Sequence, residues 1–299
     1  MATLTRPSSR TAIYLMGAGT IFLWGASFPL TKAALSYLGP TSIAFLRWAL
    51  SSAALLALLI RRSKLPAAAS LMRQDGARTL WVALTGITLF YILENTAMEY
   101  TTAINAGVLA NLTTVFMVLL GTLLLGERLT RLEWAAVGAA MLGAFLVSQG
   151  AGHLTLNRTG LIGDLLMVVA TFFAAIYSID GKRLVARHEA DVVMTMVAIA
   201  GTAMLFPLAL REGLHLDLPW QVWASLALLG LGSGALANLW WLQILSYIEA
   251  SRAAMMLLLI PIVSTSLAVL LLGEPLTLTA LIGAVLIILG VLTVERHAV

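Results

Sequence analysis

The sequence predicts an all-α integral membrane protein in which ten transmembrane helices form two inverted five-helix repeats. Three observations predict this fold: the composition, ten apolar segments, and two segments that match 147 residues apart. Hydrophobic residues make up 60% of the 299 residues and charged residues 11%. Soluble domains have about 45–50% apolar residues and about 25% charged residues. With so few charged side chains to cover a surface, lipid must cover much of this one.

Ten apolar segments have the length of a membrane helix, about 20 residues. The linkers between them are short, and no stretch is long enough to form a soluble domain. We expect the first five segments to form a repeat at 11–150 and the last five to form a second repeat at 159–294. The ten predicted spans are 11–36, 41–60, 78–100, 103–125, 132–150, 159–181, 191–210, 219–246, 251–272 and 277–294.

Basic residues between the spans predict the orientation in the membrane. If the N-terminus lies inside, the inner segments carry 14 Lys and Arg residues, and the outer loops carry only Arg158 and Arg211. Basic residues accumulate on the cytoplasmic side of membrane proteins. The sequence therefore predicts cytoplasmic tails at 1–10 and 295–299, and an even number of spans.

Two segments of the chain match without a gap at a spacing of 147 residues. Tyr100 pairs with Tyr247 and Glu127 with Glu274, each glutamate following a glycine at the end of an apolar run. The repeat unit holds five spans, and because five is odd, the second unit must enter the membrane in the opposite sense. Inverted repeats are common in secondary transporters, whose site lies near the midplane between the halves. We interpret the two glutamates as turn and helix-start residues.

Three motifs resemble a known family. Residues 250–277 read A-S-R-A-A-M-M-L-L-L-I-P-I-V-S-T-S-L-A-V-L-L-L-G-E-P-L-T, with small residues, a proline and an apolar run that ends in Gly-Glu. Residues 24–29 read W-G-A-S-F-P, and residues 97–100 read A-M-E-Y. These motifs resemble the drug/metabolite transporter superfamily, in particular its EamA-type members. The chain departs from the family at Thr114, where the first repeat often has a proline.

Within that family, the chain is most similar to the bacterial exporters of amino acids, the aromatic amino acid exporters included. The resemblance implies a multi-pass protein of the bacterial cytoplasmic (inner) membrane. It also implies that the first, third, fourth, sixth, eighth and ninth helices surround a central cavity. The implied partners are a small-molecule substrate, most specifically an amino acid, and the lipid bilayer.

Polar and aromatic residues inside the spans are the candidate substrate contacts, because polar groups within a membrane are costly and are functional candidates by default. They occur in pairs three or four residues apart, so that both side chains share a helix face. Amide groups can bind a carboxylate or an ammonium, and aromatic pairs can form a wall for an apolar side chain. The alternative for each is a structural role in helix packing. The predicted substrate-binding residues are Trp24, Phe28, Tyr91, Asn95, Asn111, Tyr177, Asn238 and Trp241.

Two further residues have predicted roles in the transport cycle. Pro261 removes a backbone donor from the ninth span and frees a carbonyl one turn earlier, so we predict a hinge there; a kink without function is the alternative. Glu94 is the deepest carboxylate of the spans and the candidate for proton coupling. No carboxylate lies clearly at a helix centre, so facilitated diffusion stays open. Arg47, inside the second span, requires a partner that the sequence does not name.

Several function classes are excluded or disfavoured. The chain has no cysteine, so it has no disulfide and no thiolate site. It has no P-loop motif, and its four histidines fall in loops or at a terminus, so we expect neither ATP-driven transport nor an enzyme. We expect no cofactor, no metal and no nucleic-acid partner. A phosphate-bearing substrate would require several basic residues in the cavity, so a zwitterionic solute fits better. Export of drugs or other metabolites is the alternative, and one chain with two halves could work as a monomer.

Overall fold

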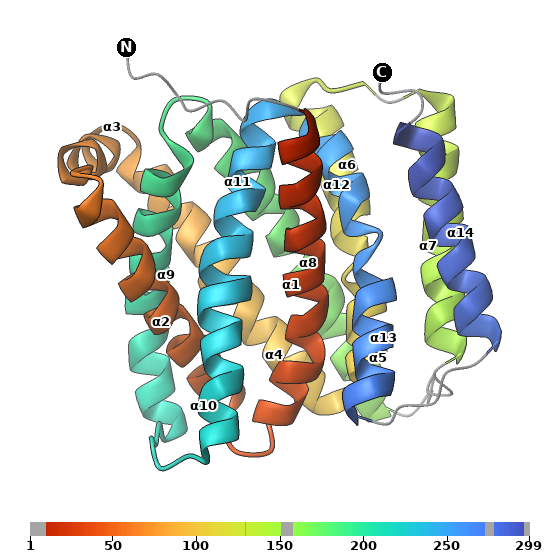
Figure 1. Ribbon diagram of the computed structural model, residues 1–299, viewed down its shortest axis with the longest axis horizontal. Coiled ribbons are helices and arrows are strands. Elements are labelled where there is room, and N and C mark those ends of the chain that lie inside the picture. The colour runs from red at the N-terminus through yellow and green to blue at the C-terminus, as the bar shows by residue number, and fades with distance from the viewer. Residues whose placement is uncertain (1–9, 129, 151–157, 273–277, 296–299) are drawn as a thin grey trace.

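The computed structural model describes residues 10–128, 130–150, 158–272 and 278–295, and every regular element in this part of the chain is a helix (Figure 1). The predicted tails lie almost entirely outside the described residues, as does Glu274. The first half of the chain contains α1 (Arg10–Ala34), α2 (Pro40–Arg61), α3 (Leu65–Ala83), η1 (Leu84–Leu89), α4 (Phe90–Tyr100), α5 (Ala103–Leu109), α6 (Leu112–Leu125) and α7 (Arg131–Gly150).

The second half of the chain follows the same order of elements. It contains α8 (Arg158–Val185), α9 (Ala190–Glu212), α10 (Trp220–Ala227), η2 (Leu228–Leu236), α11 (Ala237–Tyr247), α12 (Ala250–Leu257), α13 (Ile260–Leu272) and α14 (Leu278–Glu295). Helix α1 begins, and α14 ends, at the same end of the bundle (Figure 1). Helices α7 and α14 pack against each other at one edge.

The protein is an all-helical membrane protein. Seven helices within the described part of the chain are long and apolar enough to cross a membrane. They are Thr11–Ala34, Pro40–Arg61, Leu65–Tyr100, Gly160–Val185, Ala190–Glu212, Trp220–Tyr247 and Ala250–Leu267, and Leu112–Leu125 is a shorter apolar helix.

The third helical segment begins earlier than the sequence predicted. The expected linker before residue 78 is mostly helical, because Pro66 stands in the first turn, where its missing N–H costs no hydrogen bond. The backbone leaves the helical region at Asp75, with φ −130° and ψ 28°. Four basic residues between 61 and 73 suggested a solvated loop, but Ala68 and Leu71 are buried.

Each half has two interrupted helices at matching places. The long helix that ends in α4 contains the π-helical turn η1, and the one that ends in α11 contains η2. A break separates α5 from α6, and another separates α12 from α13 at Leu258–Leu259, just before Pro261. The first of these breaks forms without a proline, since Thr114 stands where the family often has one. The Thr114 hydroxyl donates to the Ala254 carbonyl of α12 at 2.9 Å.

Helices α2 and α9, the second long helix of each half, run antiparallel and are joined at both ends. At one end, Glu212 accepts hydrogen bonds from the backbone N–H groups of Thr41 (3.0 Å) and Ser42 (2.6 Å), the first residues of α2. At the other end, Lys64 donates to Glu189 (2.6 Å) and Asp191 (2.5 Å) at the start of α9. These two corresponding helices therefore point in opposite directions.

Two lysines repeat one structural role in the two halves. Lys32, near the end of α1, donates to the carbonyls of Met98 (2.5 Å) and Thr101 (2.7 Å), where α4 ends. Lys182, near the end of α8, donates to the carbonyls of Leu245 and Ile248, where α11 ends. The two pairs of carbonyls are 147 residues apart, the spacing of the sequence match. Each ammonium group binds carbonyls that the end of a helix leaves without a backbone donor.

We expect Lys64→Met to lower the melting temperature by a few degrees at pH 7, because partly buried ion pairs contribute about 1 kcal/mol. Burial alone would lower the pKa of Lys64, but its hydrogen bonds to Asp191 and Glu189 outweigh burial and raise this pKa above 10.5. The contribution is therefore complete below pH 10.5 and is lost as the pH rises through the higher folded-state pKa. Melting curves from pH 7 to 11 measure it, with the exposed Arg73→Met as control. An undiminished difference at pH 11 would contradict this assignment.

Candidate binding cavity

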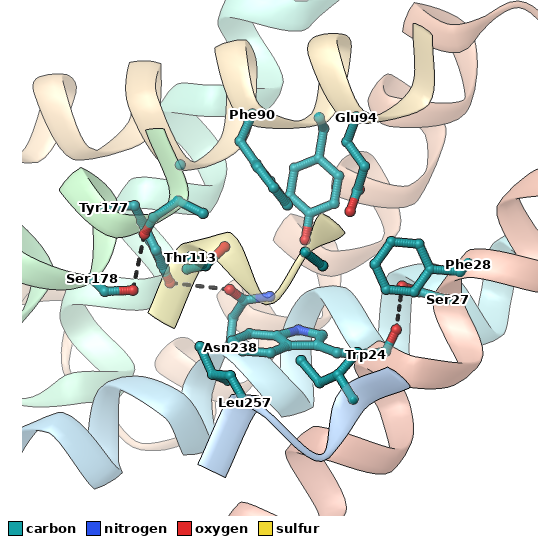
Figure 2. A pocket seen from close by; sticks show the side chains of 15 residues that line it. Trp24, Ser27, Phe28, Phe90, Glu94, Thr113, Tyr177, Ser178, Asn238 and Leu257 are labelled. Carbon is teal, nitrogen blue, oxygen red and sulfur yellow. Dashed lines mark hydrogen bonds between the residues drawn. The ribbon is translucent and has the colours of Figure 1, made fainter. Parts of the chain in front are cut away.

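A cavity lies between the two halves of the chain, and both halves line it. Its empty space is about 640 Å³, a volume that includes the part open to solvent. The lining residues are Trp24, Ser27, Phe28, Gly86, Phe90, Tyr91, Glu94, Ala110, Thr113, Ala174, Tyr177, Ser178, Asn238, Leu257 and Ile260 (Figure 2).

Interrupted helices supply many of these lining residues. Gly86 belongs to η1, and Ala110 lies at the break between α5 and α6. Asn238 follows η2, and Leu257 precedes the break before α13. π-Helical turns and helix breaks leave backbone groups without their usual partners, and in a membrane such groups are tolerated only inside the protein or beside a cavity.

Aromatic side chains form much of the cavity wall. Trp24, Phe28, Phe90, Tyr91 and Tyr177 all line it. Phe90 and Tyr91 meet edge to face with ring centroids 4.7 Å apart. The aromatic rings offer a large apolar surface to an apolar or aromatic ligand group.

A hydrogen-bonded chain crosses the cavity wall. The Tyr177 hydroxyl donates to Asn238 Oδ1 at 3.1 Å (Figure 2). Asn238 Nδ2 donates to the carbonyls of Ser233 (2.8 Å) and Gly234 (3.0 Å), both in η2. Trp24 Nε1 donates to the same Ser233 carbonyl at 3.2 Å. These contacts satisfy carbonyls of the π-helical turn and bind α1 to the second half of the chain.

One carboxylate and one guanidinium are buried beside each other in this region. Glu94 lines the cavity and is only 5% exposed. Arg47 is fully buried and does not line it; its Nη2 donates to Ser233 Oγ at 2.5 Å, and its guanidinium lies 4.4 Å from the centroid of the Tyr91 ring. The partner that Arg47 requires is thus a hydroxyl and an aromatic face. Its charge also interacts electrostatically with Glu94.

The structure brings together five of the eight predicted substrate-binding residues and the predicted proton-coupling residue. The six that line the cavity are Trp24, Phe28, Tyr91, Tyr177, Asn238 and Glu94. Their roles in binding and coupling stay predictions.

The other three predicted substrate-binding residues lie outside the cavity lining. Asn95 Nδ2 donates to the Pro40 carbonyl at 2.9 Å, and Trp241 Nε1 donates to Ser178 Oγ at 3.1 Å. Asn111 is fully buried at the break between α5 and α6, and neither atom of its amide has a partner among the described residues. A shared helix face identifies neighbours on one helix, but it does not show whether that face meets a cavity or another helix.

The sequence analysis did not predict several of the lining residues. Thr113 lines the cavity, and so does Ser178, which follows the predicted Tyr177. Gly86 lines it as well, because Tyr177 packs directly against its backbone. The signal in the sequence was a glycine within a run of apolar and threonine residues, since a glycine inside a helix can mark a close approach of another side chain.

A bundle of membrane-spanning helices around an internal cavity, built from two corresponding halves, is typical of secondary transporters. The model of the EamA-like transporter family matches residues 11–149 and, a second time, residues 161–296. The chain belongs to this family, which is part of the drug/metabolite transporter superfamily, and it is not an enzyme. The resemblance of the three sequence motifs is thereby confirmed.

Relatives of similar length support this assignment. An uncharacterized transporter of Archaeoglobus fulgidus is 30% identical over 95% of this chain and 98% of its own length. The uncharacterized transporter YyaM of Bacillus subtilis is 29% identical over 94% of this chain and 92% of its own length. A probable terminal-alkyne amino-acid exporter of Streptantibioticus cattleyicolor is 28% identical over 93% of this chain and 91% of its own length. A protein crystal structure superposes with a TM-score of 0.81 at 21% identity, covering 97% of this chain and 98% of that one, and so shares the fold.

Proposed function

We propose that this protein is a secondary transporter that exports small zwitterionic metabolites, most specifically amino acids, by alternating access through the cavity between its halves. In this proposal ten helices cross the inner membrane of a bacterium, the second five in the opposite sense to the first five. Both termini lie in the cytoplasm. One chain supplies both halves of the cavity, so a monomer suffices.

The antiparallel pairing of α2 with α9 supports the inverted arrangement. These helices hold the same position in their respective halves, yet the end of each lies at the start of the other. The repeated roles of Lys32 and Lys182 support the correspondence of the two halves. Two similar halves of opposite direction can exchange conformations, and this exchange supplies alternating access.

The observation that carries the functional proposal is the composition of the cavity wall. Residues of both halves form it, five of its fifteen lining residues are aromatic, and no lysine or arginine is among the described lining residues. A phosphate-bearing solute would lack a cationic partner there. An amino acid with an apolar side chain can pair its charged groups with Glu94 and the hydroxyl groups of the wall, and its side chain with the rings. The amino-acid exporter among the relatives favours the same class.

The aromatic lining also suits hydrophobic drugs, so drug or other metabolite export is the second candidate function. Glu94 is the proposed site of proton coupling, and Pro261, beside the break between α12 and α13, is the proposed hinge. Facilitated diffusion is the alternative to proton coupling and predicts a flux that is independent of a pH gradient.

Counterflow into liposomes tests the proposal. Purified protein is reconstituted in vesicles loaded with one unlabelled amino acid, and uptake of the labelled amino acid is measured for a panel at two pH values. We expect accumulation of apolar and aromatic amino acids above protein-free vesicles. Absence of counterflow for the entire panel, with protein that still melts cooperatively, would contradict amino-acid transport. A parallel panel of hydrophobic cationic drugs tests the second candidate.

We expect Tyr177→Phe to raise the KM for the transported amino acid about two- to tenfold. The substitution removes one hydroxyl and leaves Asn238 Oδ1 without its 3.1 Å donor, and a hydrogen bond contributes about 0.5–1.5 kcal/mol. Concentration-dependent counterflow measures the change. Tyr14→Phe, at an exposed position of α1, is the matched control and should leave KM unchanged. An unchanged KM for Tyr177→Phe would remove this hydroxyl from the site.

A further inference from the structure

We propose that the cavity recognises the ammonium group of its substrate at Glu94 and does not require a substrate carboxylate, so that primary amines with an aromatic or apolar body are ligands of the same site. This inference rests on the proposed function, because it concerns the same cavity. It follows from the hydrogen-bond donors, the acceptors and the charges that the described lining residues offer to a ligand.

The hydrogen-bond donors of the second half of the chain are already in use. The Tyr177 hydroxyl donates to Asn238, and both hydrogens of the Asn238 amide go to η2 carbonyls. The Ser178 hydroxyl donates to the Ala174 carbonyl at 3.0 Å. A bound carboxylate would have to break one of these buried bonds and would lose the stabilisation that the bond contributes.

The donors of the first half are used in the same way. The Ser27 hydroxyl donates to the Trp24 carbonyl at 2.7 Å, and the Trp24 indole N–H donates to η2. The remaining hydroxyls of the described lining residues are those of Thr113 and of Tyr91, which also interacts with Asn238, and both are neutral. The wall therefore offers a substrate carboxylate two neutral donors and no cation.

A cation, by contrast, meets a charged acceptor and aromatic faces. When ionised, the Glu94 carboxylate can only accept hydrogen bonds. It lines the cavity and accepts none from the described residues, so an ammonium can supply donors to it. Glu94 reaches into the cavity from α4 on the side where Phe28 enters from α1 (Figure 2). A carboxylate beside aromatic rings is the arrangement that binds amines, because the ring faces attract a cation as well.

Arg47 places a positive charge near Glu94 but does not line the cavity. Its guanidinium sits on the Tyr91 ring and donates to Ser233, and the side chain is fully buried. Its positive charge lies close enough to interact electrostatically with the Glu94 carboxylate. Since Arg47 is not among the lining residues, it does not offer its charge to a substrate carboxylate.

Three ligands with one phenyl body test the proposal on the unaltered protein. They are 2-phenylethylamine, a cation; L-phenylalanine, a zwitterion; and 3-phenylpropionate, an anion. Equilibrium dialysis of the radiolabelled ligands against purified protein in detergent measures the Kd of each. We expect the amine and phenylalanine to bind within about threefold of each other, and the anion to bind at least about tenfold more weakly, the usual effect of one charged hydrogen bond.

A pair of matched variants assigns the effect to the carboxylate. Glu94→Gln keeps the shape and removes the charge, and we expect it to weaken binding of the amine and of phenylalanine at least tenfold. Glu99→Gln, at an exposed position of the same helix, should bind both ligands like the wild type. Melting temperatures of both variants show that they are folded, and the comparison of the three ligands does not depend on either variant.

The outcomes separate this inference from the proposed function. Binding of the anion as tightly as the amine, no binding of the amine, or unchanged amine binding by Glu94→Gln would each overturn the inference. Counterflow of phenylalanine together with any of these results would leave the proposed function standing. Selective amine binding without counterflow of any amino acid would support the inference and contradict amino-acid transport.

Discussion

Glu127→Ala is expected to reduce transport at least about tenfold and to lower the melting temperature by roughly 10 °C. Glu127 follows the end of α6 in the first half of the chain. Its carboxylate accepts hydrogen bonds from the backbone N–H groups of Ala250 and Ser251, both at 2.8 Å, and from the Ser251 hydroxyl at 2.6 Å. The side chain is 8% exposed. It therefore caps α12, a helix of the other half, rather than the helix that follows it in sequence.

The expected loss of stability follows from the hydrogen-bond donors that the substitution leaves without an acceptor. Two buried N–H groups and a hydroxyl would lose their acceptor, at about 1–3 kcal/mol for each group left unsatisfied. About 3 kcal/mol corresponds to roughly 10 °C when 1 kcal/mol shifts the midpoint by about 2–4 °C. If this contact forms in only one of the two access states, its loss shifts their populations about a hundredfold. Such a shift slows a cycle that must visit both states.

Thermal melting in detergent and counterflow in liposomes measure the two effects. Asp217→Ala, which removes an exposed carboxylate in the loop after α9, is the matched control and should change neither. Glu127→Gln retains one acceptor oxygen and should fall between the wild type and Glu127→Ala. Normal melting and transport by Glu127→Ala would show that the cap of α12 is dispensable.

The turn at Gly126 positions Glu127. Gly126 has φ 69°, in the left-handed region that favours glycine.

Gly86→Ala is expected to reduce transport by more than about tenfold through a single methyl group. A Cβ atom at Gly86 would lie 2.1 Å from Cδ2 and 2.4 Å from Cγ of Tyr177, so the ring must move. Both residues line the cavity, and the Tyr177 hydroxyl is bonded to Asn238. Overpacking of a close-packed interior costs about 1–3 kcal/mol. The methyl group therefore displaces a cavity wall that the proposed function requires.

Counterflow and melting of Gly86→Ala should be compared with Gly138→Ala in α7, where a Cβ atom would meet nothing within 4 Å. The control should transport normally and be equal or slightly more stable, because Ala favours a helix over Gly by about 1 kcal/mol. In a Tyr177→Ala background, the substitution Gly86→Ala should cost less stability than it does in the wild type, since the clashing ring is gone. Full transport by Gly86→Ala would show that the ring position does not matter.

The membrane helices were readable from the sequence because the bilayer imposes one requirement on every span. A span must be apolar over about 20 residues, whatever its neighbours are. This local rule placed α1, α2 and α9 within a few residues. It failed for α3, which is helical from Leu65, because basic residues concealed an amphipathic segment whose Leu71 is buried. Hydropathy averages both faces of a helix and loses such a segment.

The candidate cavity was only partly readable, for a related reason. Trp24 and Tyr177 line it as predicted, but Asn95 and Trp241, on equally polar or aromatic faces, bind the Pro40 carbonyl and Ser178 instead. A helix has several inward faces in a bundle of this size. Which of them meets empty space depends on how far apart the neighbouring helices stand.

The sequence by itself determined the membrane environment, the internal duplication and the family, because hydropathy, charge bias and a fixed spacing are properties of the chain and do not depend on contacts. Tertiary structure alone decided that Glu127 caps α12, that Lys32 and Lys182 close the ends of α4 and α11, and that Glu94 faces the cavity while Arg47 does not. These residues act on helices distant in sequence. Their partners are set by the packing of whole helices, and no local pattern of residues encodes that packing.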